Sequence, residues 1–322
     1  MSDREPDEDT SVRDAVERSR SGAPAVGEVI RDRFGTDEVF QRIIAAADEE
    51  VTTDARELFF SALAGGFAIT LTFLIYSSMT AKTDGAPLLS ALLYPIGFIY
   101  IILGGYQLYT ENTVPPVALV LERLASVPAM LRQWWIVLVG NFAGGLFGAL
   151  ILAQTGVFSP EAAAAAIDIS QKGVETGFWD LFFKAGFAGL IVAGVVWLDF
   201  AARETISRFF LVYIAFLLIP LADLFHVVVS FTELMYLVFL GEAALLPGLV
   251  GFVLPVLLGN TIGGVVLVTL VNYFQTTERR VESTREDGVE RQLSLRELVG
   301  GSSVGRTYVP TDKPTKRRRE DE

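Results

Sequence analysis

The stretch Ile219-Pro220-Leu221-Ala222-Asp223-Leu224-Phe225-His226-Val227-Val228-Val229-Ser230 lies inside an apolar segment that runs from about Phe209 to Leu240. It contains the only histidine in the 322 residues. A proline and polar residues halfway through an apolar segment predict a broken helix, whose freed backbone must be buried in protein or line a cavity. Ionisable groups at membrane depth are expensive and usually face a protein interior or a water-filled path. His226 is therefore the first candidate functional residue.

The composition of the chain is that of an integral membrane protein. Hydrophobic residues make up 51% of it, and the mean hydropathy is +0.44. Because one crossing takes about 20 apolar residues, the sequence predicts an all-α polytopic membrane protein with six transmembrane helices, at about 57–80, 88–124, 131–153, 179–201, 206–241 and 246–273. The absence of cysteine excludes disulfides and thiolate metal sites. We expect no cofactor, no metal and no nucleic-acid partner.

The regions outside these spans are charged. Residues 1–35 hold too few large apolar residues to order themselves, and we expect a disordered acidic tail. Residues 36–55 place apolar side chains at helical spacing and predict an amphipathic helix on the membrane surface or against the bundle. The transmembrane domain covers residues 56–276, and a charged cytoplasmic tail covers 277–322.

The short loops predict the orientation in the cell membrane. Loops on one side carry four arginines, at positions 123, 132, 203 and 208, whereas the other side carries only Lys82 and Lys172. Positive charge collects on the cytoplasmic side of membrane proteins. We therefore expect a multi-pass protein of the cell membrane with both termini in the cytoplasm.

Two motifs recur and predict an internal repeat. The pattern G-N-x-x-G-G begins at Gly140 and again at Gly259, and Leu108-Tyr109-Thr110 resembles Leu224-Phe225-His226. Three spans per half is an odd number, so the second half would enter the membrane inverted, with two broken helices meeting near the midplane. Thr110 would then face His226. The asparagines of the repeated pattern, Asn141 and Asn260, are candidate pore or structural residues.

At these residues the chain resembles the formate/nitrite transporter family, over roughly residues 40–276. The second span of the family has two glycines eight residues apart and then L-F-T at the bend, kept here as Gly97, Gly105 and Leu108-Tyr109-Thr110. Its third and sixth spans carry G-N-x-x-G, and its broken fifth span carries the pore histidine. The resemblance implies an aquaporin-like fold, a homopentamer with one pore per subunit, and passage of small monovalent anions or their conjugate acids.

The resemblance also implies roles for individual residues. Tyr94 and Phe98 would form the cytoplasmic constriction, and Leu108 with Ile219 the outer one. Lys172 falls within one residue of the outer-vestibule lysine of the family, which would attract anions.

Four positions depart from the family and indicate a divergent branch. Relatives known for formate or nitrite have Glu just before the histidine and Asn four residues after it, where this chain has Phe225 and Ser230. Gly189 stands where the family often has Asn, and Asp223 appears three residues before His226. The identity of the substrate therefore stays open.

The chemistry expected of the histidine is proton donation. A small anion loses hydration energy in an apolar constriction, and its neutral acid loses much less. An imidazole with a reference pKa near 6.5 can give a proton to the anion and recover it from water, while Thr110 holds the ring. The alternative is a histidine that only packs between helices. Lys184 is expected to pair with Asp180; Asp223 and Glu233 either line the vestibule or bind backbone donors.

Other functions remain open at this point. A neutral-solute or water channel would share the fold, and a membrane protein with a closed pore would play a structural or regulatory part. An intramembrane enzyme is not indicated, because the sequence has no H-E-x-x-H and no G-x-S-x-G.

Overall fold

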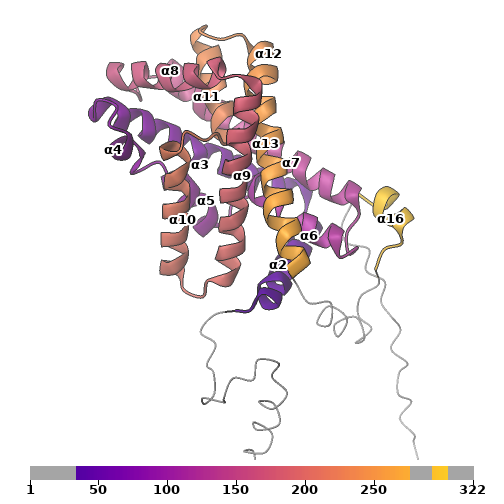
Figure 1. The fold of residues 1–322 in the computed structure, drawn as a ribbon. Helices are drawn as coiled ribbons and strands as arrows, with labels where there is room; N and C mark the ends of the chain where they lie inside the picture. The colour runs from indigo at the N-terminus through magenta and orange to yellow at the C-terminus, as the bar shows by residue number, and fades with distance from the viewer. Residues whose placement is uncertain (1–33, 276–291, 304–322) are drawn as a thin grey trace, which may run out of the picture. The chain divides into compact units, whose positions relative to one another are not determined.

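The computed structural model describes residues 34–275 and 292–303, and every regular element within these ranges is a helix (Figure 1). The predicted tails therefore lie largely outside the described residues. The helices are α2 (Thr36–Thr52), α3 (Ala55–Lys82), α4 (Pro87–Ala91), α5 (Ile96–Gly104), α6 (Pro115–Leu121), α7 (Val127–Gln154), α8 (Pro160–Glu175), α9 (Phe178–Ala201), α10 (Thr205–Leu221), α11 (Val227–Leu240), α12 (Leu245–Gly248), α13 (Leu254–Gly264), α14 (Val271–Gln275) and α16 (Leu295–Gly300).

Several of these helices are suited to a bilayer. Within residues 34–275 and 292–303, five helical stretches are long and apolar enough to cross it, namely α3, Pro87–Gly104, α7, α9 and Leu245–Gln275. The last of these runs through α12, α13 and α14 with two π-helical stretches between them, while α10 and α11 are shorter apolar helices. The chain is therefore an all-helical membrane protein, as predicted.

The chain leaves helical geometry at both predicted breaks. After α5, Gly105 has a φ of 69°, a left-handed value that glycine adopts without steric cost. The chain resumes with a 3-10 turn at Glu111–Thr113 and then α6, which starts on Pro115. In the second break α10 ends one residue after Pro220, and Asp223 has a φ of 57° before α11 begins. Each break thus contains a residue with a left-handed backbone conformation, Gly105 in the first and Asp223 in the second.

Two helices outside the spans mark the two ends of the bundle. In Figure 1, α8 lies at the top of the view with α12, and α2 lies at the bottom; we call these ends the α8 side and the α2 side. The buried residues of α2 form one face, against α6 and α9. The helix α8 packs on α3 and α11 through its small residues. The sequence analysis missed α8, although Ser159 before Pro160 is a typical helix start.

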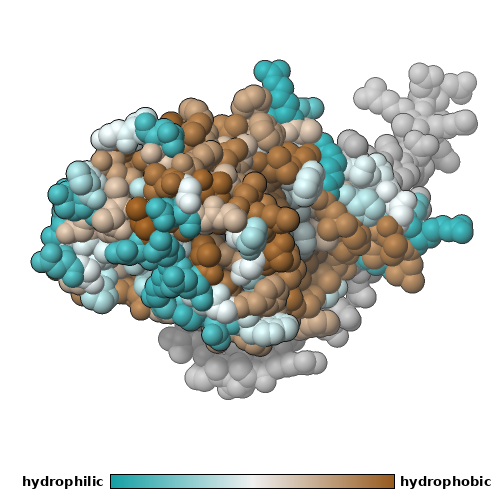
Figure 2. Space-filling model, turned by 90° about the horizontal axis from the view of Figure 1, so that it is seen from above, coloured by the Kyte–Doolittle hydropathy of each residue, from teal (hydrophilic) through white to brown (hydrophobic). Residues whose placement is uncertain are grey.

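The surface between these ends is apolar. Large exposed hydrophobic side chains include Trp135 and Phe147 on α7 and Phe183 and Phe187 on α9. Figure 2 shows the molecule from the α8 side, with apolar residues over much of that face and hydrophilic residues in separate clusters. Such surface is compatible with lipid or with neighbouring subunits.

Candidate pore

The two breaks meet at His226 and Thr110. The Nε2 atom of His226 lies 2.8 Å from Oγ1 of Thr110, and both residues are about 1% exposed. His226 is the residue before the first turn of α11, and Thr110 is the last before the 3-10 turn. The structure therefore brings together the two residues that the sequence analysis expected to face each other.

A stack of aromatic rings lies beside this pair. The Phe98 ring lies edge-on to the His226 ring, with 5.0 Å between centroids, and it stacks on Phe216 at 3.9 Å. Tyr94 also stacks on Phe98, at 5.7 Å between centroids. Phe98 is fully buried. An apolar passage of this kind resists a charged solute more than a neutral one.

A cavity of about 270 Å³ opens next to His226 on the α8 side, and its lining includes Tyr94, Lys172, Ser230 and Glu233. Tyr94 therefore lies on the same side as Lys172. The prediction that placed Tyr94 at the opposite mouth from Lys172 is wrong, because α4 and the start of α5 lie at the α8 end of the bundle.

The other three predicted constriction residues, Phe98, Leu108 and Ile219, do not line the α8-side cavity. Phe98 lies between the two mouths, since Tyr94 precedes it in the α8-side cavity and Ile101 follows it in the α2-side cavity. Leu108 and Ile219 are fully buried in the apolar core, and neither lines the cavity that contains Lys172. The expected outer constriction of Leu108 with Ile219 is therefore not at that mouth.

Lys172 belongs to a cluster of three charges. Its Nζ bonds Oδ1 of Asp223, and the Nζ of Lys184 lies 2.7 Å from Oδ2 of the same carboxylate. Lys184 thus pairs with Asp223 in the second break, rather than with Asp180 on its own helix as predicted. The carboxylate joins α8, α9 and the break, and the cluster keeps one net positive charge at the mouth.

Replacing Asp223 with Asn is expected to raise anion uptake at low ionic strength by roughly 3-fold, because two lysines then lose their neutralising partner. The gain should disappear at 1 M salt, where the Debye length is about 3 Å. Initial uptake rates at several salt concentrations check this. Asp180→Asn, an exposed carboxylate at the start of α9, is the control. Unchanged uptake in Asp223→Asn at low salt would contradict the account.

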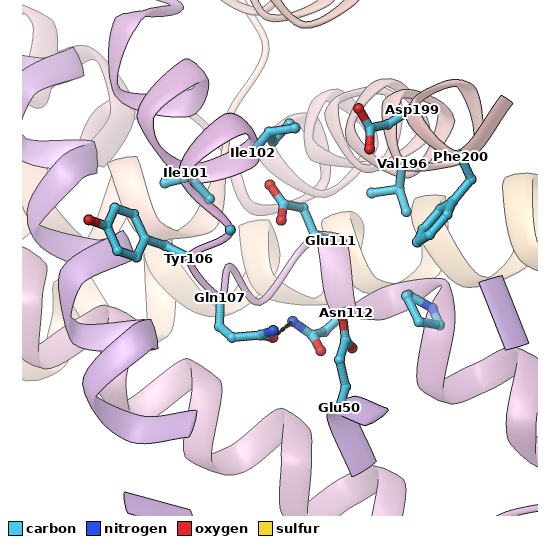
Figure 3. Close-up of a pocket in the computed structure, with 12 residues that line it drawn as sticks. Glu50, Ile101, Ile102, Tyr106, Gln107, Glu111, Asn112, Val196, Asp199 and Phe200 are labelled. Carbon is cyan, nitrogen blue, oxygen red and sulfur yellow. Dashed lines mark hydrogen bonds between the residues drawn. The ribbon is translucent and has the colours of Figure 1, made fainter. Parts of the chain in front are cut away.

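A second cavity, of about 230 Å³, opens on the α2 side (Figure 3). Its lining includes three carboxylates, from Glu50, Glu111 and Asp199. A chain of side-chain hydrogen bonds runs along it: Asn112 donates to Gln107 at 2.8 Å, and Gln133 donates to Asn112 at 2.7 Å and to Glu50 at 3.1 Å. These bonds connect α2 to the first break. The sequence analysis missed this site, because it placed Glu50 only within an amphipathic helix.

Burial raises the pKa of the Glu50 carboxyl to about 7, although hydrogen bonds from Gln133 and Gln107 act in the opposite direction. The folded chain therefore holds this proton where the unfolded chain has lost it. The free energy of unfolding should be highest below about pH 4.5 and fall, by at most about 3 kcal/mol, as the pH rises through 7. Glu50→Gln should remove this part of the pH dependence, whereas Glu57→Gln on the exposed start of α3 should keep it. Thermal unfolding in detergent from pH 4 to pH 8 measures both, and identical profiles for Glu50→Gln and the wild type would refute the assignment.

Two asparagines hold the breaks by matching contacts. Asn141 accepts from Tyr109 N at 2.8 Å and donates to the carbonyls of Gln107 and Ala62. Asn260 accepts from Val227 N at 2.8 Å and donates to the carbonyls of Phe225 and Ala185. Both asparagines are fully buried. Their role is structural: they satisfy the backbone that the breaks set free.

Small residues allow these contacts. A Cβ on Gly66 would lie 2.0 Å from the carbonyl oxygen of Asn141, and one on Gly189 would lie 2.2 Å from that of Asn260. The Asn that the family often has at position 189 could not fit this packing unchanged. The contacts also correct one detail of the predicted repeat. Asn141 bonds the carbonyl of Gln107 as Asn260 bonds that of Phe225, so these two residues are equivalent. The residue after each is then equivalent too, which makes Leu108, and not Thr110, the counterpart of His226.

Taken together, membrane-length helices, two non-helical segments that meet at the buried pair of His226 and Thr110, and a cavity on either side of this pair are typical of a membrane channel or transporter. The model of the formate/nitrite transporter family matches residues 37–274. The chain belongs to this family, which confirms the resemblance found in its sequence.

Individual proteins agree with this. Inner membrane protein YfdC of Escherichia coli is 30% identical over 242 residues, which cover 74% of this chain and 77% of that protein. A solved FNT family ion channel superposes with a TM-score of 0.69 at 21% identity, covering 74% of this chain and 99% of that one. A solved pentameric formate channel with formate bound has a TM-score of 0.59 at 20% identity, covering 69% and 97%. The two structures share the fold of this chain.

Proposed function

We propose that the chain is a pore for small monovalent anions that are bases of weak acids, such as formate or nitrite, and that each crosses the constriction together with a proton. The observation that carries this proposal is the contact of 2.8 Å between His226 Nε2 and Thr110 Oγ1 beside the Phe98 ring. Family membership favours this class of solute over neutral solutes.

His226 would act as a proton donor at this point. As an imidazolium, His226 would donate its Nε2–H to Thr110 Oγ1 and present its Nδ1–H to the α8-side cavity, where no described group bonds it. An anion in this cavity would accept the Nδ1 proton, which leaves a neutral acid and a neutral imidazole. The ring then regains its proton from water.

The mouth cluster would collect the anion. Lys172 and Lys184 share one carboxylate, so this cluster, which lies in the same cavity as Asp168, carries a single positive charge that would attract a monovalent anion from the α8 side. The α2 side carries carboxylates instead, and so favours release of an anion or passage as the neutral acid.

We also propose the assembly and orientation. The matching contacts of Asn141 and Asn260 support two inverted halves of three spans, and the pentameric channel that shares the fold supports a homopentamer. Because both breaks belong to one chain, each subunit would have its own pore. The arginines of the short loops favour cytoplasmic termini, with the α8 side outside.

A panel of solutes in vesicles tests the function. Purified chain in liposomes should pass formate and nitrite faster as the outside pH falls, and should pass glycerol no faster than protein-free vesicles. Flux of glycerol without flux of either weak acid would contradict the proposal.

A further inference from the structure

Three polar side chains lie along one face of α11 and its N-cap, with the spacing i, i+4 and i+7 that helical neighbours have. They are His226, Ser230 and Glu233, and all three line the α8-side cavity. Their residues are 1%, 1% and 6% exposed. At 1.5 Å per residue, Glu233 lies about 10 Å from His226 along α11, toward the α8 side.

None of the three is satisfied within the described part of the chain. His226 Nδ1 and Ser230 Oγ have no hydrogen-bond partner there, and the Glu233 carboxyl group forms no hydrogen bond or ion pair with the described residues. Buried polar groups in native structures nearly always have a partner. Two buried, unpartnered atoms, beside the Glu233 carboxyl group on the same wall of one cavity, therefore point to a ligand that enters the cavity, and 270 Å³ holds several waters or a small acid.

In the part of the chain that the structure describes, no cation forms an ion pair with the Glu233 carboxyl group. The other titratable groups of this cavity come from α3, the segment after α4, α8 and the second break; they are Tyr76, Tyr94, Asp168, Lys172 and Asp223. Lys172 bonds Asp223, as does Lys184. An unpaired carboxylate is costly when buried. The neutral carboxyl group is thus the form that fits this wall, and it has an O–H to donate.

We propose that Glu233 is a second proton donor for the permeating weak acid, placed before His226 on the path from the α8 side. The carboxyl O–H bond breaks and the proton moves to an oxygen of the anion, which leaves a neutral acid and a Glu233 carboxylate. Water that enters through the mouth returns the proton. Ser230 Oγ and His226 Nδ1 hydrogen-bond the solute as it approaches the Phe98 ring.

This inference rests on the proposed passage of weak acids and names the chemical class more closely. A solute must be able to take a proton from a carboxyl group, as formate and nitrite can. Chloride and nitrate, the anions of strong acids, cannot do so. The wall should therefore select for weak-acid anions among monovalent anions of similar size.

Formate uptake by the full chain in liposomes, from pH 5 to pH 8, tests the role of Glu233. Glu233→Gln keeps the size and hydrogen bonding of the side chain but has no proton to transfer. It should lower the flux at least about 10-fold and flatten the pH dependence. Glu233→Asp should retain a pH-dependent flux. Glu242→Gln, just beyond the end of the same helix and exposed, should match the wild type.

The outcomes separate the two proposals. A wild-type chain that moves no weak acid would overturn the proposed function. A wild type that moves formate, with a Glu233→Gln variant of equal flux and equal pH profile, would overturn the role of Glu233 alone.

If the Glu233→Gln variant fails to assemble, chemical labelling of the wild type still tests the role of Glu233. Dicyclohexylcarbodiimide reacts with protonated carboxyl groups in apolar surroundings, and peptide mapping should find it on Glu233, with less labelling when formate is present. No label on Glu233 would also overturn its role.

Discussion

Replacing His226 with alanine is expected to lower formate flux by roughly 100-fold, at the low end of what a well-placed proton donor contributes. The variant loses the ring that bonds Thr110 at 2.8 Å and that lies against Phe98. No imidazole then remains in the chain, because His226 is its only histidine. The remaining flux should lose the part of its pH dependence that the imidazole provides. Initial rates in liposomes from pH 5 to pH 8 measure both effects.

A glutamine at the same position separates packing from proton transfer. His226→Gln largely fills the space and can still hydrogen-bond Thr110, but it does not titrate. It should resemble His226→Ala in flux and resemble the wild type in stability. A His226→Gln variant with wild-type flux and pH profile would show that the histidine only packs between helices.

Replacing Asn260 with leucine is expected to cause the largest loss of stability. The change leaves the amide of Val227 and the carbonyl of Phe225 without their partner in a fully buried position, whereas the carbonyl of Ala185 keeps its helical bond within α9. Unsatisfied buried groups cost about 1–3 kcal/mol each, so the free energy of unfolding should fall by at least about 2 kcal/mol. Because Val227 follows His226, transport should fail together with the fold. Thermal unfolding of the detergent-solubilised oligomer measures the loss.

Asn272 offers a matched control on the same helical run. Its side chain bonds only the Val268 carbonyl one turn earlier, at 2.9 Å, among the contacts of the described residues. Asn272→Leu should therefore change stability by no more than about 0.5 kcal/mol. Similar stability of Asn260→Leu and Asn272→Leu would mean that Asn260 does not hold the second break.

Hydrophobic periodicity and helix-breaking residues were enough to predict much of the fold from the sequence. The spans at 57–80, 131–153 and 179–201 agree with α3, α7 and α9 to within a few residues. The break at Pro220 to His226 was visible because proline and polar residues are rare in an apolar segment. The pairing of Thr110 with His226 was predicted from the repeat. The contacts of Asn141 and Asn260 show, however, that Thr110 and His226 are not equivalent positions in the two halves.

The features that the sequence analysis missed depend on contacts between segments that are distant in the sequence. No spacing rule brings Asp223 to Lys172 and Lys184, since the three come from the second break, α8 and α9. A local rule predicted Lys184 with Asp180 and was wrong for that reason. The side on which Tyr94 lies, and the carboxylates of the α2-side cavity, likewise require the packed structure.

The central claim is that a weak-acid anion crosses together with a proton, and one measurement tests it most directly. Liposomes that contain the chain, a trapped pH dye and a potential clamped with potassium and valinomycin receive a formate gradient, beside protein-free liposomes. We predict acidification of the interior at a rate that exceeds the protein-free rate and does not change with the membrane potential, because a neutral acid carries no charge. Formate entry that follows the membrane potential without acidification would contradict the account.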